Sequence, residues 1–524
     1  MKNLSTKRLL ACVLAAAMML TLMAGCGGST ASSAAPSGSG NAASGAAGDK
    51  LKISMMYNDN PSYPFDANWE ALQLIQEMGN VELDIQAIPN QDYDSKVRVL
   101  LNSGNIPDFV TYVTNEVYTE FADTGLLLNI SEHMDKFPNL AAKIEAYDIE
   151  DEIENWRTKD GSLYGLPFMN EKDMYNTCPA IRMDVLEKYN LEVPTTFDEL
   201  YTVLKTVKEN EPDSLPMANH NGEASLRDIS GVCWGIEGSY NGFMYDEATN
   251  QYVYADTSDN YKEYIKFMNK LISEGLADPE IYTASLDQWK QKMASGSSVF
   301  CYTWVSELAQ INADGKKLVG EEFNLAPIAP IEGPGGKFHR AAGRIYQVAI
   351  IPASAAEKPY FDELCKFIDW MCYSDEGTVP TTWGIEGKTY EVKDGKKVFT
   401  QEVLDAPSIQ AKLWSYGASN NNFTQIYPYD WFVKVLNEPL VETFTAEAIE
   451  KGWFPPIAKT PKLDTDQRED EKMLLTTVKD YSDQMREQFV FGKLDIDAEW
   501  DNYVKTINEK GVTKLLEMYN ASLQ

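Results

Sequence analysis

The segment from residue 51 to residue 113 alternates between strand-like and helix-like patterns, and this alternation limits the fold more than any other feature of the sequence. The strand-like runs cover residues 51–55, 81–87 and 108–113, and the helix-like runs cover residues 69–75 and 93–101. Helices of this length can cross a sheet, so the order predicts parallel strands joined by right-handed crossovers. The sequence therefore predicts an α/β fold.

The loop after the first strand-like run is a candidate binding surface. Ligands of parallel α/β sheets bind outside the carboxyl ends of the strands. Residues 57–65 follow such an end and combine amides, a carboxylate and aromatic rings. We therefore expect this loop to face a crevice.

The chain is longer than one hydrophobic core usually supports. It has 524 residues, of which 44% are hydrophobic and 24% are charged, an ordinary globular composition. Two or more lobes are expected for this length. A stretch rich in Pro and Gly at residues 327–336 is predicted to cross between them.

The charge balance excludes one class of partner. There are 46 Lys and Arg residues against 79 Asp and Glu residues, which gives a formal net charge of −33. The sequence contains no cluster of basic residues. A net charge of this sign repels nucleic-acid phosphates. No nucleic-acid partner is expected.

The N-terminus has the pattern of an export signal followed by a tether. Residues 1–25 combine three basic residues with a long apolar run, as in a secretory signal peptide. Residues 22–26 resemble a bacterial lipobox, which implies that Cys26 is lipid-modified; the alternative is a plain signal peptide with an incidental cysteine. Residues 26–49 are otherwise mostly Gly, Ser and Ala, a flexible composition. We expect a protein held by lipid on the extracellular face of a cell membrane.

Neither a metal site nor a cofactor site is predicted. Beyond Cys12 and Cys26 the chain has five cysteines, with no CxxC pair, and its three histidines are isolated from one another and from the cysteines. Buried free thiols are therefore the expected state of these cysteines.

Several short sequence segments, taken together, resemble those of a known protein family. They are the segments 101–108, 121–130, 160–167, 181–200, 274–280 and 383–388, with the C-terminal tail 500–519. In this order they resemble the extracellular solute-binding proteins of family 1, in the large lipoprotein variety that serves ABC sugar importers of Gram-positive bacteria. The resemblance covers the whole chain after the signal peptide.

The resemblance implies a two-lobe, periplasmic-binding-protein-like fold of the class II type, with hinge segments between the lobes and the ligand cleft between them. Lobe 1 is expected to comprise residues 50–165 and 328–376, and lobe 2 residues 166–327 and 377–524. It also implies a monomeric receptor, not an enzyme, whose partners are an oligosaccharide and the permease of an ABC transporter. The segment 207–216 lacks the glycine and oxygen ligands of the calcium loop found in some large members, so no calcium is expected there.

The candidate ligand-binding residues are of the types that recognise sugars. Sugar hydroxyls need fixed hydrogen-bonding partners and sugar rings stack on aromatic faces, so we selected such residues in expected loops or at strand ends. The candidates are Asn58, Asp59, Tyr63, Phe65 and Asp108 early in the chain, Asn170, Glu171 and Asp173 after the first crossing, Trp234, Tyr240, Trp304 and Glu307 in the second lobe, Arg344 and Tyr346 after the Pro/Gly-rich crossing, and Trp383, Trp414, Tyr416, Asn421, Tyr429 and Trp431 near the C-terminus.

Other functions remain open at this point. A secreted glycosidase needs only two suitably spaced carboxylates, and spacing along the sequence does not exclude them. No Gly-x-Ser-x-Gly, His-Glu-x-x-His or phosphate-binding glycine motif is present. A receptor of the same fold could take peptides or another polar metabolite, and a surface adhesin would need repeats or disulfide modules, which the sequence lacks.

Overall fold

The computed structural model describes residues 50–523 except 62, 221–222, 237–241, 341–342, 437–438, 456 and 458. The predicted signal peptide, the lipid-modified Cys26 and its tether, and the candidate Tyr240 lie outside the described residues. Within these limits, none of the helices combines the length and the apolar character of a membrane span.

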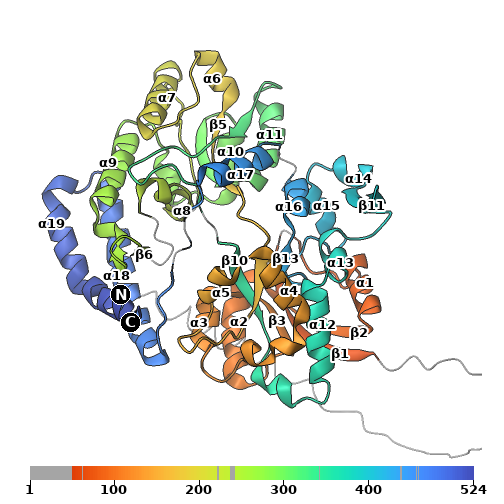
Figure 1. Cartoon of the computed structure of the whole chain (residues 1–524). Coiled ribbons are helices and arrows are strands. Elements are labelled where there is room, and N and C mark those ends of the chain that lie inside the picture. Colours follow the sequence, from red (N-terminus) through yellow and green to blue (C-terminus); the bar gives the residue numbers. More distant parts are fainter. Residues whose placement is uncertain are drawn as a thin grey trace, which may run out of the picture. The chain divides into compact units, whose positions relative to one another are not determined.

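A six-stranded mixed sheet forms the centre of the first lobe (Figure 1). Its order is β13-β4-β10-β3-β1-β2, in which β1 is parallel to β2 and β3, whereas β10 is antiparallel to β3 and β4. The strands are β1 Leu51–Asp59, β2 Val81–Pro89, β3 Phe109–Thr114, β4 Leu166–Asn170, β10 Ile345–Ile350 and β13 Ile426–Tyr427. The predicted β-α-β-α-β order of residues 51–113 is confirmed.

The helices of the first lobe pack their apolar faces on this sheet. The long ones are α1 Glu70–Met78, α2 Asn90–Ser103, α4 Pro138–Tyr147 and α12 Phe361–Tyr373, with the shorter α3 Asn115–Phe121, α5 Glu150–Glu154 and 3-10 turns at Ile130–Lys136 and Ala353–Glu357. Leu72, Val97, Leu140 and Ile368 from the four long helices share one core with Val110 of β3. Helices therefore contribute to the same core as the strands, as the crossover pattern requires.

A satellite of short elements completes the first lobe. It consists of α13 Thr378–Thr382, the hairpin β11 Tyr390–Lys393 and β12 Lys396–Phe399, α14 Gln401–Leu404, α15 Ile409–Trp414 and α16 Tyr429–Leu436. Trp383 and Trp431 share a core there with Phe168 of β4.

The second lobe is built on a three-stranded antiparallel sheet of order β8-β5-β9. Its strands are β5 Thr177–Arg182, β8 Phe300–Trp304 and β9 Leu325–Pro327, and a separate hairpin is formed by β6 Phe243–Asp246 and β7 Gln251–Tyr254. Its helices are α6 Met183–Tyr189, α7 Phe197–Asn210, α8 Glu223–Trp234, α9 Asp259–Ser273, α10 Leu286–Ala294, α11 Val305–Leu318, α17 Pro439–Lys451, α18 Thr465–Val490, α19 Ile496–Ile507 and α20 Thr513–Ala521, with 3-10 turns at Ala255–Thr257 and Pro279–Tyr282 and a π-turn at Asn508–Val512.

Local sequence signals explain two of these helices. In α9 the apolar residues recur at helical spacing and are buried: Tyr261, Tyr264, Ile265, Met268 and Leu271. Thr196 caps α7 by accepting a hydrogen bond from the backbone N–H of Glu199 at 3.2 Å. The Glu199 carboxylate accepts from the N–H of Thr195 at 2.8 Å rather than from that of Thr196, so only half of a reciprocal capping box is formed.

The structure divides the chain between the lobes differently from the sequence-based boundaries. Residues 166–170 and 377–436 were assigned to lobe 2, but β4 and β13 belong to the first sheet and the short elements pack against it. Conversely, Ile328 and Ile331 pack in a second-lobe core although residue 328 was assigned to lobe 1. The boundaries differ because a Pro- and Gly-rich segment indicates where the chain turns, not which residue is the last to pack in a given lobe. The five cysteines of the described part of the chain are buried and outside any disulfide there.

Candidate functional site

One edge of the first sheet collects most of the predicted site. The strands β1, β3 and β4 end there, and β10 begins there because it runs in the opposite direction. β13 is parallel to β4, with Tyr427 opposite Asn170, so it also ends at this edge. We call this the carboxyl edge. It carries the loop after Asn58 together with Asn170, Arg344 and Tyr346, residues far apart in the sequence.

Four tyrosines gather at the carboxyl edge, and we call them the tyrosine cluster: Tyr63, Tyr112, Tyr346 and Tyr427. Burial raises the pKa of each hydroxyl. Electrostatic interaction with neighbouring tyrosines raises the pKa values of Tyr63, Tyr346 and Tyr427 further, so these hydroxyls remain protonated at physiological pH. The hydroxyls of Tyr346 and Tyr427 both bond to Asn421, which leaves the aromatic faces of the cluster as its groups for a ligand.

Part of this cluster remains open to solvent. Tyr346 keeps 40% of its surface exposed, although its hydroxyl is enclosed and accepts a hydrogen bond from Asn421 Nδ2 at 3.1 Å. Tyr63 is half-buried and packs on Trp414, with ring centroids 4.6 Å apart and an interplanar angle of 34°. Exposed aromatic faces beside an amide are the groups that a sugar ring requires.

Three consecutive asparagines hold the loop that carries Asn421. The buried Asn422 Oδ1 accepts from the Asn58 N–H and from Thr111 Oγ1, both at 2.8 Å, and its Nδ2 donates to the Asn58 carbonyl at 3.1 Å. Asn420 Nδ2 donates to the Tyr57 hydroxyl at 2.8 Å. Asn421 is the half-exposed member of the three, and Tyr427 donates its hydroxyl proton to Asn421 Oδ1. The two buried amides thus fix the position of the one that faces solvent.

Arg344 is used by the fold rather than left available for a ligand. Its guanidinium donates to Glu152 Oε1 at 2.5 Å and to the carbonyls of Tyr147 and Asp148 at 2.6 and 2.7 Å. Arg344 is a candidate ligand-binding residue, but carbonyls at the end of α4 and the carboxylate of Glu152 in α5 engage its guanidinium.

Asp108 lies at the opposite end of β3 from the crevice. It is 2% exposed and accepts hydrogen bonds from the N–H and hydroxyl of Ser54 at 2.9 and 2.6 Å, and it forms an ion pair with Lys358. Asp108, a candidate ligand-binding residue, precedes its strand, and the amino ends of parallel strands point away from the carboxyl edge.

The other first-lobe candidates divide between contacts at the edge and core positions. Asp59 accepts from the Phe65 N–H at 2.8 Å and so closes the first loop, and Phe65 packs on Tyr57. Glu171 accepts from the Tyr429 N–H at 2.8 Å. Half-exposed candidates here are Asp59, Tyr63, Phe65, Asn170, Glu171, Asp173, Trp414, Tyr416, Asn421 and Tyr429, whereas Trp383 and Trp431 are buried in the satellite core.

In the second lobe, Trp304 is the candidate best placed to meet a ligand. It is half-buried at the end of β8, opposite Thr177, where the chain arrives from the carboxyl edge of the first lobe. Glu307 forms an ion pair with Lys290. Trp234 is only 5% exposed and packs on Phe197 with ring centroids 4.4 Å apart, so it is a core residue.

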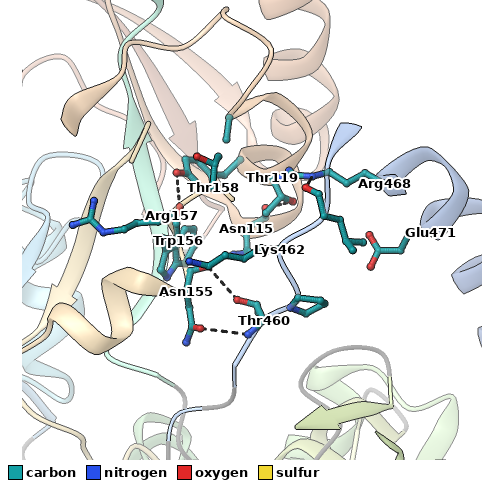
Figure 2. A pocket seen from close by; sticks show the side chains of 14 residues that line it. Asn115, Thr119, Asn155, Trp156, Arg157, Thr158, Thr460, Lys462, Arg468 and Glu471 are labelled. Carbon is teal, nitrogen blue, oxygen red and sulfur yellow. Dashed lines mark hydrogen bonds between the residues drawn. The ribbon is translucent and has the colours of Figure 1, made fainter. Parts of the chain in front are cut away.

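A pocket lies beside α3 (Figure 2). Residues 115–122 and 155–158 line one side and residues 460–471 the other. The Thr460 N–H donates to Asn155 Oδ1 at 3.3 Å (Figure 2). Lys462 forms an ion pair with Glu154, a residue beside the pocket. These bonds use polar groups of the pocket to join the lobes, and no pattern in the sequence predicted them.

Tyr112, Asn422 and Tyr427 were missed by the sequence analysis. Tyr112 lies within an apolar strand run, which gives no sign of a site residue, and Tyr427 belongs to β13, which has only two residues. The repeated asparagines at 420–422 were the available signal for Asn422, since such a run in a loop needs partners for its amides.

A family model described as Bacterial extracellular solute-binding protein matches residues 70–382, more than half of the chain. The chain belongs to this family. The resemblance inferred from the sequence phrases is thereby confirmed.

Among curated relatives, this solute-binding protein is 25% identical to lipoprotein LipO of Bacillus subtilis over 401 residues, covering 74% of this chain and 73% of LipO. It is 27% identical to the polygalacturonan/rhamnogalacturonan-binding protein YtcQ of Bacillus subtilis over 394 residues, 73% of each chain. It is 23% identical to the fructooligosaccharide ABC transporter substrate-binding protein FusA of Streptococcus pneumoniae over 506 residues, 89% of each chain.

Solved structures support the fold. The alginate-binding protein AlgQ2 without calcium superposes with a TM-score of 0.74 at 22% identity, covering 91% of this chain and 99% of AlgQ2. FusA of Streptococcus pneumoniae in complex with kestose gives a TM-score of 0.69 at 20% identity, covering 90% and 98%. The predicted two-lobe α/β fold is confirmed.

Proposed function

We propose that this solute-binding protein captures an oligosaccharide outside the cell and presents it to the permease of an ABC importer. The carboxyl edge, where the tyrosine cluster, Trp414 and Asn421 combine aromatic faces with fixed hydrogen-bonding groups, supports this proposal most directly. The names of relatives add support, since they include polygalacturonan, fructooligosaccharide and melibiose/raffinose/stachyose binding.

Ligand capture would proceed by closure of the two lobes. The carboxyl edge offers Tyr346 and Asn421, and the second lobe offers Trp304. Only a closed state brings both sets of groups to one ligand, so the ligand favours closure by the free energy of the interactions that form in that state alone. The permease would then distinguish the closed protein from the open one.

The proposal includes the cellular location. The lipobox-like segment before Cys26 and the name of the relative LipO support acylation of Cys26 and attachment to the extracellular face of the membrane. The flexible residues that follow Cys26 would let a monomeric body reach the permease.

The sugar is proposed to leave unchanged, as expected of a receptor rather than a glycosidase. Asp59 and Glu171, carboxylates at the carboxyl edge, each accept a backbone N–H that holds them in place. Orientation of loops and strand ends is a sufficient role for both.

Calorimetry of residues 50–524 against fructooligosaccharides, raffinose-type sugars, oligogalacturonides and short peptides tests the proposal. A sugar should bind, raise the melting temperature and be recovered intact by mass spectrometry. Tyr346→Ala should weaken binding roughly tenfold, while Tyr201→Ala on α7 should not change it. Cleavage of the sugar, or binding of peptides alone, would refute the proposal.

A further inference from the structure

Strand β3 contains a β-bulge at the carboxyl edge. Val113 pairs with Val348 and Val110 pairs with Ile350, so β3 advances three residues while β10 advances two. The extra residue falls at Thr111–Tyr112. Bulges of this kind redirect a side chain and are common beside functional sites.

Tyr112 adopts a backbone conformation that tyrosine normally avoids. Its φ is +57°, in the left-handed region, where the Cβ atom crowds the backbone. Most other non-glycine residues of the described chain with positive φ are Asn or Asp, which tolerate the region, and Tyr112 is the one aromatic among them. Such strain persists where the surrounding structure enforces it, and it concentrates at functional sites.

A second bulge lies on the neighbouring strand. Ile345 pairs with Met169 and Val348 with Pro167, so the extra residue of β10 falls at Tyr346–Gln347. The two bulges therefore sit on adjacent strands and each places a tyrosine at the carboxyl edge. Gln347, which follows Tyr346, is 2% exposed, and its Nε2 finds no hydrogen-bonding partner among the described residues, so the β10 bulge buries an unsatisfied donor there.

The side chain of Tyr112 is half-buried: it packs against the first-lobe core and keeps part of its surface open to solvent. Its strand pairs directly with β10, the strand that carries Tyr346. Thr114 at the end of the strand is fixed by a 3.0 Å hydrogen bond from its hydroxyl to Asp94 of α2, which holds the backbone that follows the bulge.

We propose that Tyr112 is a ligand-contacting residue that determines specificity for a pyranose or furanose ring. The bulge directs its ring beside Tyr63 and Tyr346, so that three tyrosines line one wall against which the C–H face of a single sugar unit packs. This inference rests on the proposed function and deepens it, because it assigns the wall and the part of the sugar that the wall contacts.

Three substitutions test the contact. Tyr112→Gly and Tyr112→Ala both remove the ring, but only glycine accepts the left-handed backbone without strain. If the ring contacts sugar, both variants should bind at least tenfold more weakly and to a similar extent, whereas Tyr112→Phe should bind within about threefold of the wild-type protein. Asn190→Gly, the same backbone change at the distant end of α6, is the control and should bind normally.

The outcomes separate this inference from the function on which it rests. If the wild-type protein binds a sugar and Tyr112→Gly binds it with the same affinity, the proposed contact is wrong but the receptor function stands. Weakening in Tyr112→Ala but not in Tyr112→Gly would also overturn it, because the effect would then act through the backbone. Failure of the wild-type protein to bind any sugar would refute the proposed function and this inference together.

Discussion

Two neighbouring asparagines should have opposite roles, and this contrast is a strong test of the site. Asn422 is 1% exposed and bonds to the end of β1 and to Thr111, whereas Asn421 is half-exposed and bonds to tyrosines of the cluster. We expect Asn422→Ala to destabilise the protein and Asn421→Ala mainly to weaken ligand binding.

The magnitude for Asn422 follows from the groups that lose a partner. Its amide satisfies the buried N–H of Asn58 at 2.8 Å and the carbonyl of Asn58 at 3.1 Å. Leaving a buried polar group unsatisfied costs about 1–3 kcal/mol, so two groups predict a loss of about 2–6 kcal/mol in the free energy of unfolding. Thr111 is less affected, because its hydroxyl also lies 3.1 Å from the Met56 carbonyl.

Urea titration of residues 50–524, followed by tryptophan fluorescence, measures this loss as a lower midpoint. Asn421→Ala should change the free energy of unfolding by less than about 1 kcal/mol, since its groups can bond to water instead. Calorimetry with the sugar found for the wild-type protein completes the comparison. Equal unfolding midpoints for the two variants would refute the reasoning that separates the buried amide from the exposed one.

Three further predictions concern charged and titratable groups. Arg344→Ala should lower the free energy of unfolding by about 3–5 kcal/mol, because it strands the buried Glu152 carboxylate; an unchanged urea midpoint with reduced sugar affinity would contradict this. Burial alone would raise the pKa of Asp108, but the hydrogen bonds from Lys358 and Ser54 lower it by more, so its pKa lies below the usual 3.8. Its stabilisation is therefore present above pH about 3.8 and is lost as the pH falls through the folded-state value, and Asp108→Asn should flatten the acid limb of a stability–pH curve. Burial lowers the pKa of His339 from 6.5 to about 3, so the folded state favours the neutral ring and stability should fall as the pH drops below about 6.5; His339→Phe should remove that part of the pH dependence in the same melting experiments.

The order of the first strands could be predicted because each has a regular pattern and short connections. Residues 51–113 alternate or repeat at the spacing of the element they form, so the β-α-β-α-β order and the carboxyl edge followed directly. The loop from Asn58 to Phe65 was placed correctly at that edge for the same reason. Local periodicity was sufficient there.

Local patterns could not predict what depends on distant pairing. β10 inserts antiparallel between β3 and β4, and its own sequence does not indicate which strands it will pair with. β13 has only two residues, too few for a recognisable strand pattern. The role of Arg344 depended on carbonyls nearly two hundred residues earlier in the chain. The bulge at Tyr112 arises from the register between two such strands, and no residue type at that position signals it.

The insertion of β10 has a consequence for the order in which the protein is made. β3 ends at Thr114 and β4 begins at Leu166, yet the strand that lies between them in the sheet is Ile345–Ile350. During synthesis and export, β3 therefore presents an open hydrogen-bonding edge until the whole sheet of the second lobe has emerged. Open strand edges invite pairing with other chains. The sheet that begins first is therefore completed after the sheet of the second lobe, and export must protect its open edge during that interval.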